Sequence, residues 1–217
     1  MATARRLLVL VAGATMAAPA AGAQAPARGA QRTGGSSWRV GASTGGYVPR
    51  SSVIISADGS NTRLSAGPSF SLDLQYLASR SVSVYANGTV TFSTITLGTS
   101  IRPSVIGPSN QVLLTGGTAG LLLTSGWLGE HLQPTLRLGG GFKWYSFDLA
   151  GAQNQWRPTA DIGLGFRGVG SGPIEVTAEV RYLPSSFDQS KLPIRGIVPQ
   201  AQRQNDLLFG VGIGIRP

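Results

Sequence analysis

The chain has 217 residues, enough for one domain of ordinary size, and contains no cysteine, which excludes disulfide bonds and thiolate chemistry. Only 12% of the residues are charged, against about 25% in a typical soluble domain, so much of the surface is expected to face something other than water. The net charge of +9 comes without any cluster of five or more lysines and arginines. This argues against nucleic-acid binding and favours loop arginines that face anionic lipid headgroups.

The N-terminal segment, residues 1–23, has the features of a secretory signal peptide. Arg5 and Arg6 precede a short apolar run, and the small-residue motif Ala-Gly-Ala follows at residues 21–23. We expect cleavage directly after this motif and a flexible leader over residues 24–36. No later stretch of the sequence is apolar for about 18 residues, so no transmembrane helix is predicted.

After the leader, apolar and polar residues alternate with period two in eight segments. In one of them Leu72 and Leu74 alternate with Ser71 and Asp73. Such alternation puts the two sets of side chains on opposite faces of a β-strand. The predicted strands cover residues 37–47, 67–76, 81–94, 111–124, 134–147, 156–167, 174–183 and 206–216.

The third predicted strand contains Asn87-Gly88, a strong signal for a two-residue hairpin. A turn at this point would place Val84 opposite Thr91 and mix apolar with polar side chains on each face. An unbroken strand keeps one face apolar, so we predict that the strand continues through these residues.

The connections between the predicted strands alternate in length. They have roughly 19, 16, 8 and 22 residues after strands one, three, five and seven, and roughly 4, 9 and 6 residues after strands two, four and six. Long loops at one end and short turns at the other are typical of outer-membrane barrels. We therefore predict that residues 37–217 form an all-β, eight-stranded antiparallel up-and-down transmembrane β-barrel, with both ends of the barrel domain on the short-turn, periplasmic side.

Outward-facing aromatic residues are predicted to form two belts around an aliphatic band. Aromatic side chains sorted in this way match a lipid-facing surface, whereas a soluble core has no reason to sort them by height. A soluble sandwich or lipocalin-like barrel with the same alternation is the alternative. The belts comprise Trp38, Tyr76 and Phe166 near the short turns and Phe92, Trp144, Trp156, Tyr182 and Phe209 near the long loops.

The polar faces carry nearly balanced charges, as enclosed side chains need if each is to find a partner. Eight strands leave an interior just wide enough for side chains, so we predict that ion pairs fill the lumen. If residue numbers in strands six and seven sum to 342 at each pair, Arg167 faces Glu175 and Asp161 faces Arg181. The alternative is a register that is slipped by one step, in which these charged residues make only diagonal contacts across the two strands. The predicted network comprises Asp73, Arg137, Lys143, Arg157, Asp161, Arg167, Glu175, Glu179 and Arg181.

The signal peptide, the eight alternating strands, the alternating loop lengths and the final strand LLFGVGIGIRP resemble the small outer-membrane β-barrel proteins of the OmpA/OmpX type. The resemblance covers residues 37–217 and is one of pattern, since no short diagnostic motif is present. It implies a protein of the Gram-negative cell envelope that lies in outer-membrane lipid and is inserted by the outer-membrane assembly machinery. We expect a monomer.

Two motifs suggest other chemistry but fit the barrel better. The sequence GLGFRG at residues 163–168 matches the letters of a dinucleotide-binding motif, yet its glycines fall within a strand and a turn follows. His131, the only histidine, follows Glu130 in a predicted short turn, without the H-x-S spacing of barrel enzymes that act on lipid A. With one histidine and no cysteine, neither a transition-metal site nor a cofactor is predicted.

The long loops are expected to carry the specific function. Residues 47–67 and 184–206 mix arginines with apolar residues, which are either strand extensions or contact sites for an extracellular ligand. We predict a non-enzymatic barrel with a structural or surface-interaction role through loops one, two and four. A small passive channel for ions or apolar solutes is one alternative, and a lipid-modifying enzyme is another. The apolar loop residues include Ile54, Ile55, Ile194 and Val198.

Overall fold

The computed structural model describes residues 37–55, 61–96, 110–126, 131–148, 152–169, 172–192 and 201–216. The predicted signal peptide and leader lie outside these residues, as do Glu130, Ile194 and Val198. Within the described residues, no helix has the length and apolar character needed to cross a membrane.

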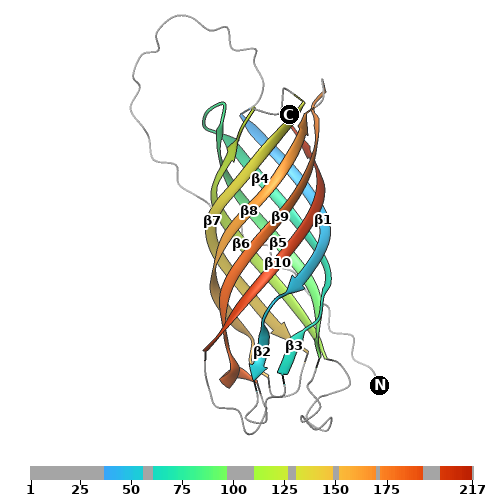
Figure 1. The fold of residues 1–217 in the computed structure, drawn as a ribbon, viewed down its shortest axis with the longest axis vertical. Coiled ribbons are helices and arrows are strands. Elements are labelled where there is room, and N and C mark those ends of the chain that lie inside the picture. Colours follow the sequence, from blue (N-terminus) through green and yellow to red (C-terminus); the bar gives the residue numbers. More distant parts are fainter. Residues whose placement is uncertain are drawn as a thin grey trace, which may run out of the picture. The chain divides into compact units, whose positions relative to one another are not determined.

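Eight long antiparallel strands form a closed barrel (Figure 1). Each strand pairs with its neighbours along the chain, and pairing of the first with the last closes the sheet. The predicted all-β, eight-stranded up-and-down barrel is therefore confirmed. The strands are β1 (Trp38–Pro49), β4 (Gly67–Leu77), β5 (Val82–Thr96), β6 (Gln111–Thr124), β7 (Leu132–Phe147), β8 (Gln155–Val169), β9 (Ile174–Asp188) and β10 (Ala201–Ile215).

Strand β5 runs straight through the potential hairpin signal, as predicted. Asn87 pairs with Asp73 and Gly88 pairs with Leu72, both in β4. The alternation of the side chains, and not the local turn preference of Asn-Gly, therefore decides the structure here, because a turn would have put apolar side chains on the polar face.

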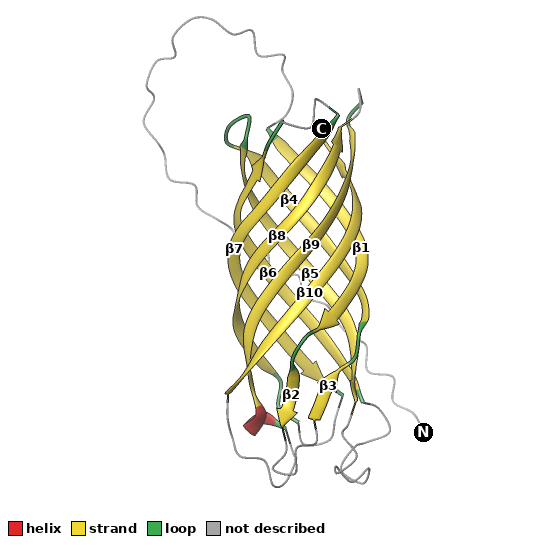
Figure 2. Cartoon of the chain, viewed as in Figure 1, coloured by secondary structure: helices red, strands yellow, loops and turns green. Residues whose placement is uncertain are grey.

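Three short elements lie at the long-loop end of the barrel (Figures 1 and 2). Strands β2 (Ser52–Ile55) and β3 (Asn61–Leu64) form a hairpin, and β3 continues the sheet by pairing with the end of β5. A 3₁₀ helix, η2 (Gln189–Lys191), follows β9. Ile54 and Ile55 lie in β2. The opposite end is the short-turn end, where β4, β6, β8 and β10 end and β5, β7 and β9 begin.

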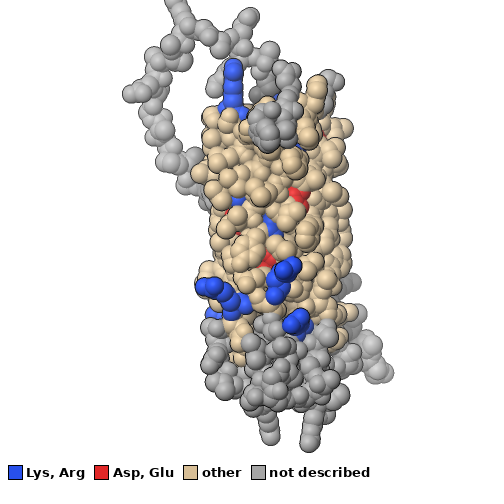
Figure 3. Space-filling view, viewed as in Figure 1, with Lys and Arg blue, Asp and Glu red and all other residues tan. Residues whose placement is uncertain are grey.

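The apolar faces of the strands point out of the barrel and the polar faces point in. Leu72, Ile162 and Val176 are 67%, 44% and 58% exposed, whereas Asp161 and Arg181 are 0% and 1% exposed. Uncharged residues make up most of the drawn face in Figure 3. This orientation is the reverse of a soluble sandwich or lipocalin-like barrel, in which the apolar side chains would fill the centre.

The interior is polar near the short turns and becomes largely apolar near the long loops, where it still encloses Lys143 and Asp206. Phe187 contacts the ring of Tyr145 at a centroid distance of 5.3 Å and the ring of Phe147 at 6.0 Å. The alternation of the strands predicted a polar lumen, so this inner core is a difference. We call it the loop-end core; its buried members are Tyr47, Leu64, Ile95, Val112, Leu114, Tyr145, Leu183, Phe187, Leu192 and Leu208.

Candidate functional site

The polar interior is built from charged clusters that follow one another along the barrel. Strands β7, β8 and β9 contribute most of the charged residues in these clusters, because each strand carries inward-facing charged residues at several positions along the barrel axis. From the long loops towards the short turns, the clusters centre on Asp206, Asp161, Arg137 and Glu175.

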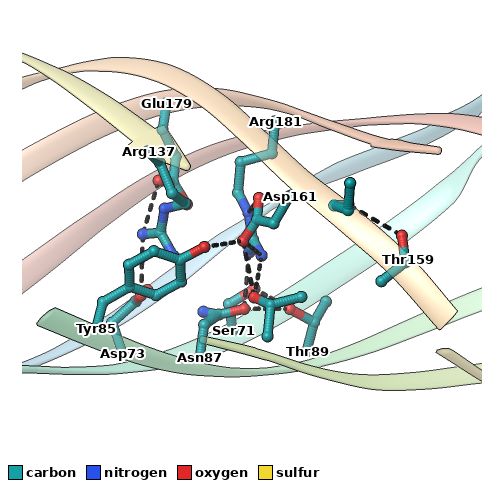
Figure 4. Close-up of polar contacts among 12 residues, drawn as sticks. Ser71, Asp73, Tyr85, Asn87, Thr89, Arg137, Thr159, Asp161, Glu179 and Arg181 are labelled. Carbon is teal, nitrogen blue, oxygen red and sulfur yellow. Dashed lines mark hydrogen bonds and ion pairs between the residues drawn. The ribbon is translucent and has the colours of Figure 1, made fainter. Parts of the chain in front are cut away.

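Asp161 is the centre of the most completely bonded cluster (Figure 4). Arg181 donates to both of its carboxylate oxygens, from Nε at 3.1 Å and from Nη2 at 2.7 Å. The hydroxyls of Tyr85 and Thr118 donate to Oδ2 at 2.9 and 2.7 Å. Arg181 also donates from Nη1 to Asn87 Oδ1 at 2.7 Å. Four strands of the barrel, β5, β6, β8 and β9, thus meet around one carboxylate, which satisfies a charge that would otherwise be costly to bury.

Arg137 bridges two carboxylates from opposite directions. Its Nη2 donates to Asp73 Oδ1 at 2.9 Å and contacts Glu179 Oε2 at 3.0 Å. The guanidinium also lies 4.3 Å from the centroid of the Tyr85 ring, a cation–π geometry. Tyr85 therefore connects this cluster to that of Asp161 (Figure 4).

The predicted register of β8 and β9 is wrong by two residues. Gly163 pairs with Arg181 and Arg167 pairs with Thr177, so paired residue numbers sum to 344 rather than 342. Arg181 and Arg167 still reach Asp161 and Glu175, at 2.7 and 3.4 Å, but diagonally across the strands. A shift of two residues keeps every side chain on its face, so alternation alone could not distinguish the two registers.

The ladder between β8 and β9 is interrupted near this cluster. Paired residues stop at Thr159 with Ser185 and resume at Ile162 with Tyr182. Pro184 lies opposite the gap and has no backbone N–H to donate. Its carbonyl accepts a hydrogen bond of 2.9 Å from Thr159 Oγ1, so a side chain connects the two strands where the ladder is interrupted.

Lys143 pairs with Asp206, a carboxylate that the sequence analysis did not include. Lys143 Nζ donates to Asp206 Oδ2 at 2.6 Å and to the Leu183 carbonyl at 2.5 Å. Tyr47 and Gln204 donate to Asp206 Oδ1 at 2.9 and 2.8 Å. The sequence could have predicted Asp206 as a member of the network, because alternation puts this residue on the same face as the inward glycines of its strand.

Arg157 lies at the edge of the long-loop end, where it forms an ion pair of 2.8 Å with Asp188. Asp188 caps η2 and accepts hydrogen bonds from the hydroxyl and backbone N–H of Ser190, at 2.6 and 3.1 Å. These bonds and the nearby guanidinium lower the pKa of Asp188. The side chains of Arg157 and Asp188 are 24% and 31% exposed, more than those of the ion-paired residues inside the lumen such as Asp73 and Glu179.

Glu175 stands at the short-turn end among three guanidiniums. Arg39 and Arg167 approach it at 3.4 Å, and Arg216 donates a short hydrogen bond to it. Arg167 also donates to Gln75 Oε1 at 2.7 Å. Arg39 and Arg216 are absent from the predicted network, although their parity places both on inward faces.

The predicted belt aromatics all lie on the outside of the barrel, exposed. The register shows their heights: Trp38 pairs with Tyr76 near the short turns, and Trp144 pairs with Trp156 near the long loops. Phe166 lies towards the short-turn end of β8. Phe92 and Tyr182 lie in the long-loop halves of their strands. Phe209 was predicted near the long loops but lies just past the middle of β10 towards the short turns, because this strand begins at Ala201 and not at Asp206.

His131 is exposed at the short-turn end, where Nδ1 lies 3.3 Å from the backbone carbonyl of Val169. No hydrogen bond joins it to a serine or a carboxylate in the part of the chain that the structure describes. The GLGFRG sequence lies inside β8, without a helix after it. Across the described ranges, no group of three or more His, Cys, Asp or Glu side chains could hold a metal ion.

Comparison with solved structures identifies the architecture. Neisserial surface protein A superposes with a TM-score of 0.53 and 13% sequence identity, over 85% of this chain and 99% of that one. The outer-membrane protein OprG from Pseudomonas aeruginosa superposes with a TM-score of 0.53 and 14% identity, over 85% of this chain and 99% of that one. No protein-family model and no curated protein sequence matches the chain. The protein therefore has the closed eight-stranded fold of small outer-membrane β-barrels.

Proposed function

We propose that this protein is a non-enzymatic β-barrel of the bacterial outer membrane, with a structural or surface-interaction role at its long-loop end. Export would use the signal peptide at residues 1–23, and the assembly machinery of the outer membrane would insert the barrel as a monomer. The observation that carries the proposal is the reversed polarity of the barrel. An apolar outer face is stable in lipid, where every backbone group of a closed barrel is paired.

A filled lumen favours this role over a passive channel. The loop-end core and the Lys143–Asp206 pair occupy the interior near the long loops, and the other charged clusters occupy the rest. Three cavities that border these clusters have volumes of about 40, 30 and 10 Å³. A larger, more open hollow of about 670 Å³ reaches Glu179, but it is lined mostly by residues such as Leu164, Val180 and Val211, which are exposed on the outer face. An ion crossing the barrel would have to separate buried ion pairs and displace aromatic side chains, each at a cost of several kcal/mol.

The loop-end core also supports a surface role. It holds Leu64 of β3 and Leu192 after η2 against side chains from the barrel strands. The bases of the long loops therefore pack against buried side chains of the barrel. Rigid scaffolds commonly present binding loops, so this packing supports a role in contact with an extracellular ligand or protein.

Membrane location is tested by expressing the complete chain, separating inner and outer membranes, and comparing gel migration of boiled and unboiled samples. We expect the mature protein in the outer-membrane fraction, with a band that shifts on boiling because a closed barrel resists detergent until heated. Recovery in the soluble periplasmic fraction, without such a shift, would contradict the proposal.

Conductance of the refolded protein in planar bilayers tests the structural role against the channel. We expect no steady conductance above that of protein-free bilayers. A matched variant, Lys143→Ala with Asp206→Ala, removes one ion pair without leaving a lone charge and shows whether a loosened lumen can be detected. Steady conductance by the unaltered protein would replace the structural role with the passive channel.

A further inference from the structure

The charges at the short-turn end of the lumen do not balance. Three guanidiniums converge on the single carboxylate of Glu175, and the adjoining cluster has one guanidinium, Arg137, and two carboxylates. The combined set has four positive and three negative charges, a net charge of +1. The clusters around Asp161 and Asp206, by contrast, each pair one acid with one base.

The surplus positive charge is accompanied by unused hydrogen-bond donors. Arg167 is only 2% exposed, yet its Nη1 donates to no described residue, and its Nε lies 3.4 Å from Glu175 without a hydrogen bond. Nε of Arg39 likewise lies 3.4 Å from Glu175 without a hydrogen bond, and Nη1 and Nε of Arg137 donate to no described residue. Buried guanidinium N–H groups are normally hydrogen-bonded, because leaving one unsatisfied costs about 1–3 kcal/mol or more. The concentration of such donors at the short-turn end of the lumen calls for an acceptor.

A cavity of about 40 Å³ borders these donors. Its walls include Arg39, Arg137 and Arg167, together with Gln75, Thr135 and Thr177. A water molecule needs roughly 10–15 Å³ of such space, so the cavity has room for a small ion with one or two waters but not for a bulky organic anion. Arg216, the most exposed member of the cluster, stands beside Glu175 at the mouth of the barrel.

We propose that this cavity binds a single small monovalent anion of the halide class. One negative charge brings the seven charged groups to neutrality, and a spherical anion can accept hydrogen bonds from several guanidiniums at once. The cavity wall also contains Asp73, Glu175 and Glu179, whose repulsion of an anion is reduced because each is in contact with at least one arginine. Water could accept the same hydrogen bonds, but it carries no charge to offset the surplus of the cluster.

Diffraction from crystals of the mature protein grown in bromide tests the site directly. Bromide scatters anomalously, so we expect one anomalous peak in the cavity within hydrogen-bond distance of Arg167, and its replacement by chloride when the crystals are transferred. Ordinary water density without an anomalous peak would overturn the proposal.

Stability in solution gives a second test that does not depend on crystals. We expect the heat-modifiable transition to rise in temperature, saturably, when bromide replaces gluconate at constant ionic strength. Arg167→Gln should weaken the apparent bromide affinity by about tenfold, as expected for loss of a charge-assisted hydrogen bond. Arg157→Gln, at the opposite end, is the matched control and should leave the affinity unchanged.

The variants also separate a bound ion from general screening. Screening would shift the transition equally in the original protein, Arg167→Gln and Arg157→Gln, and that result would overturn the proposal. Arg39→Gln provides a second variant at the same cavity if Arg167→Gln does not fold, and it should weaken bromide binding in the same direction.

Discussion

The lumen of the barrel is filled by different kinds of side chain in its long-loop half and in its short-turn half. Near the long loops, aromatic and aliphatic side chains surround the buried Lys143–Asp206 pair and fill most of the lumen, much as they would fill the core of a soluble domain. Near the short turns, buried arginines and carboxylates fill it in paired clusters. The outer face shows no such division, since exposed apolar side chains cover both halves.

This difference shows that lipid constrains only the outside of the wall. Any set of inward side chains is acceptable if it fills the lumen and leaves no polar group without a partner. The apolar half tolerates variation in detail, because dispersion and burial are not directional. The charged half depends on specific hydrogen-bond and ion-pair partners, so a single substitution should lower the free energy of unfolding more there than in the apolar half.

The largest effect is expected from Arg181→Ala in the charged half. The change leaves the Asp161 carboxylate, 0% exposed, without its main partner and removes the donor to Asn87. Breaking a buried pair in this way costs about 3–5 kcal/mol. Denaturant unfolding in lipid vesicles, followed by tryptophan fluorescence, measures the loss.

The matched control removes both charges, as Asp161→Asn with Arg181→Met. Because no lone charge remains, we expect this double variant to be more stable than Arg181→Ala alone. If the single and double variants lose the same free energy of unfolding, the charged half would not depend on pairing as argued.

A somewhat smaller effect is expected from Leu114→Ala in the apolar half. Leu114 is buried in the loop-end core, so truncation should cost about 3 kcal/mol, from lost burial and a residual cavity. Leu113, the residue directly before it in β6, has the opposite parity and faces outwards. Leu113→Ala should cost less than half as much, because lipid or detergent chains can occupy the vacated space. Equal losses would mean that the two faces are not in different environments.

The strands and their two faces could be predicted from the sequence because alternation with period two is a local signal. It was strong enough to override the Asn87-Gly88 turn preference, and it placed Asp161 and Arg181 on one face. The fold could therefore be predicted almost completely from patterns within single strands.

Features that depend on pairs of strands could not be predicted in the same way. The register of β8 and β9 is two residues from the predicted one, a difference that alternation cannot detect and that long arginine side chains tolerate. The loop-end core was missed because inward Tyr47, Leu114 and Tyr145 interrupt the expected polar face only near strand ends. Arg39 and Arg216 were missed because they lie at strand ends, where parity is easily disregarded. Asp206 was missed because it was the first residue of the predicted strand, whereas β10 begins at Ala201.

Gly139→Ala is expected to perturb the charged half without changing any charge. A Cβ atom at residue 139 would lie 2.2 Å from the Tyr85 hydroxyl oxygen and 2.4 Å from the Ala119 carbonyl oxygen. The methyl group would push Tyr85 away from Asp161 and strain the backbone, at a cost of about 1–3 kcal/mol. Unfolding in lipid vesicles measures this cost.

The neighbouring glycine supplies the control for this steric argument. A Cβ atom at Gly140 would approach nothing closer than the Thr159 carbonyl oxygen at 3.5 Å, an ordinary contact. Gly140→Ala should therefore change the unfolding free energy by less than about 0.5 kcal/mol. A large loss in Gly140→Ala would show that glycine is needed in this strand for reasons other than the room it leaves for Tyr85.

The smallest effect is expected at the exposed ion pair of Arg157 with Asp188, because water screens both partners. Arg157→Gln should cost no more than about 1 kcal/mol at pH 6. The pKa of Asp188 is lowered by Ser190 and Arg157, so its contribution is complete above the unfolded value of about 3.9 and is lost as the pH falls below it. Asp188→Asn should remove this part of the acid dependence, which is measured as the change in unfolding free energy between pH 6 and pH 3 relative to the original protein. An Arg157→Gln loss as large as that of Arg181→Ala would erase the distinction between exposed and enclosed charges on which the comparison of the two halves depends.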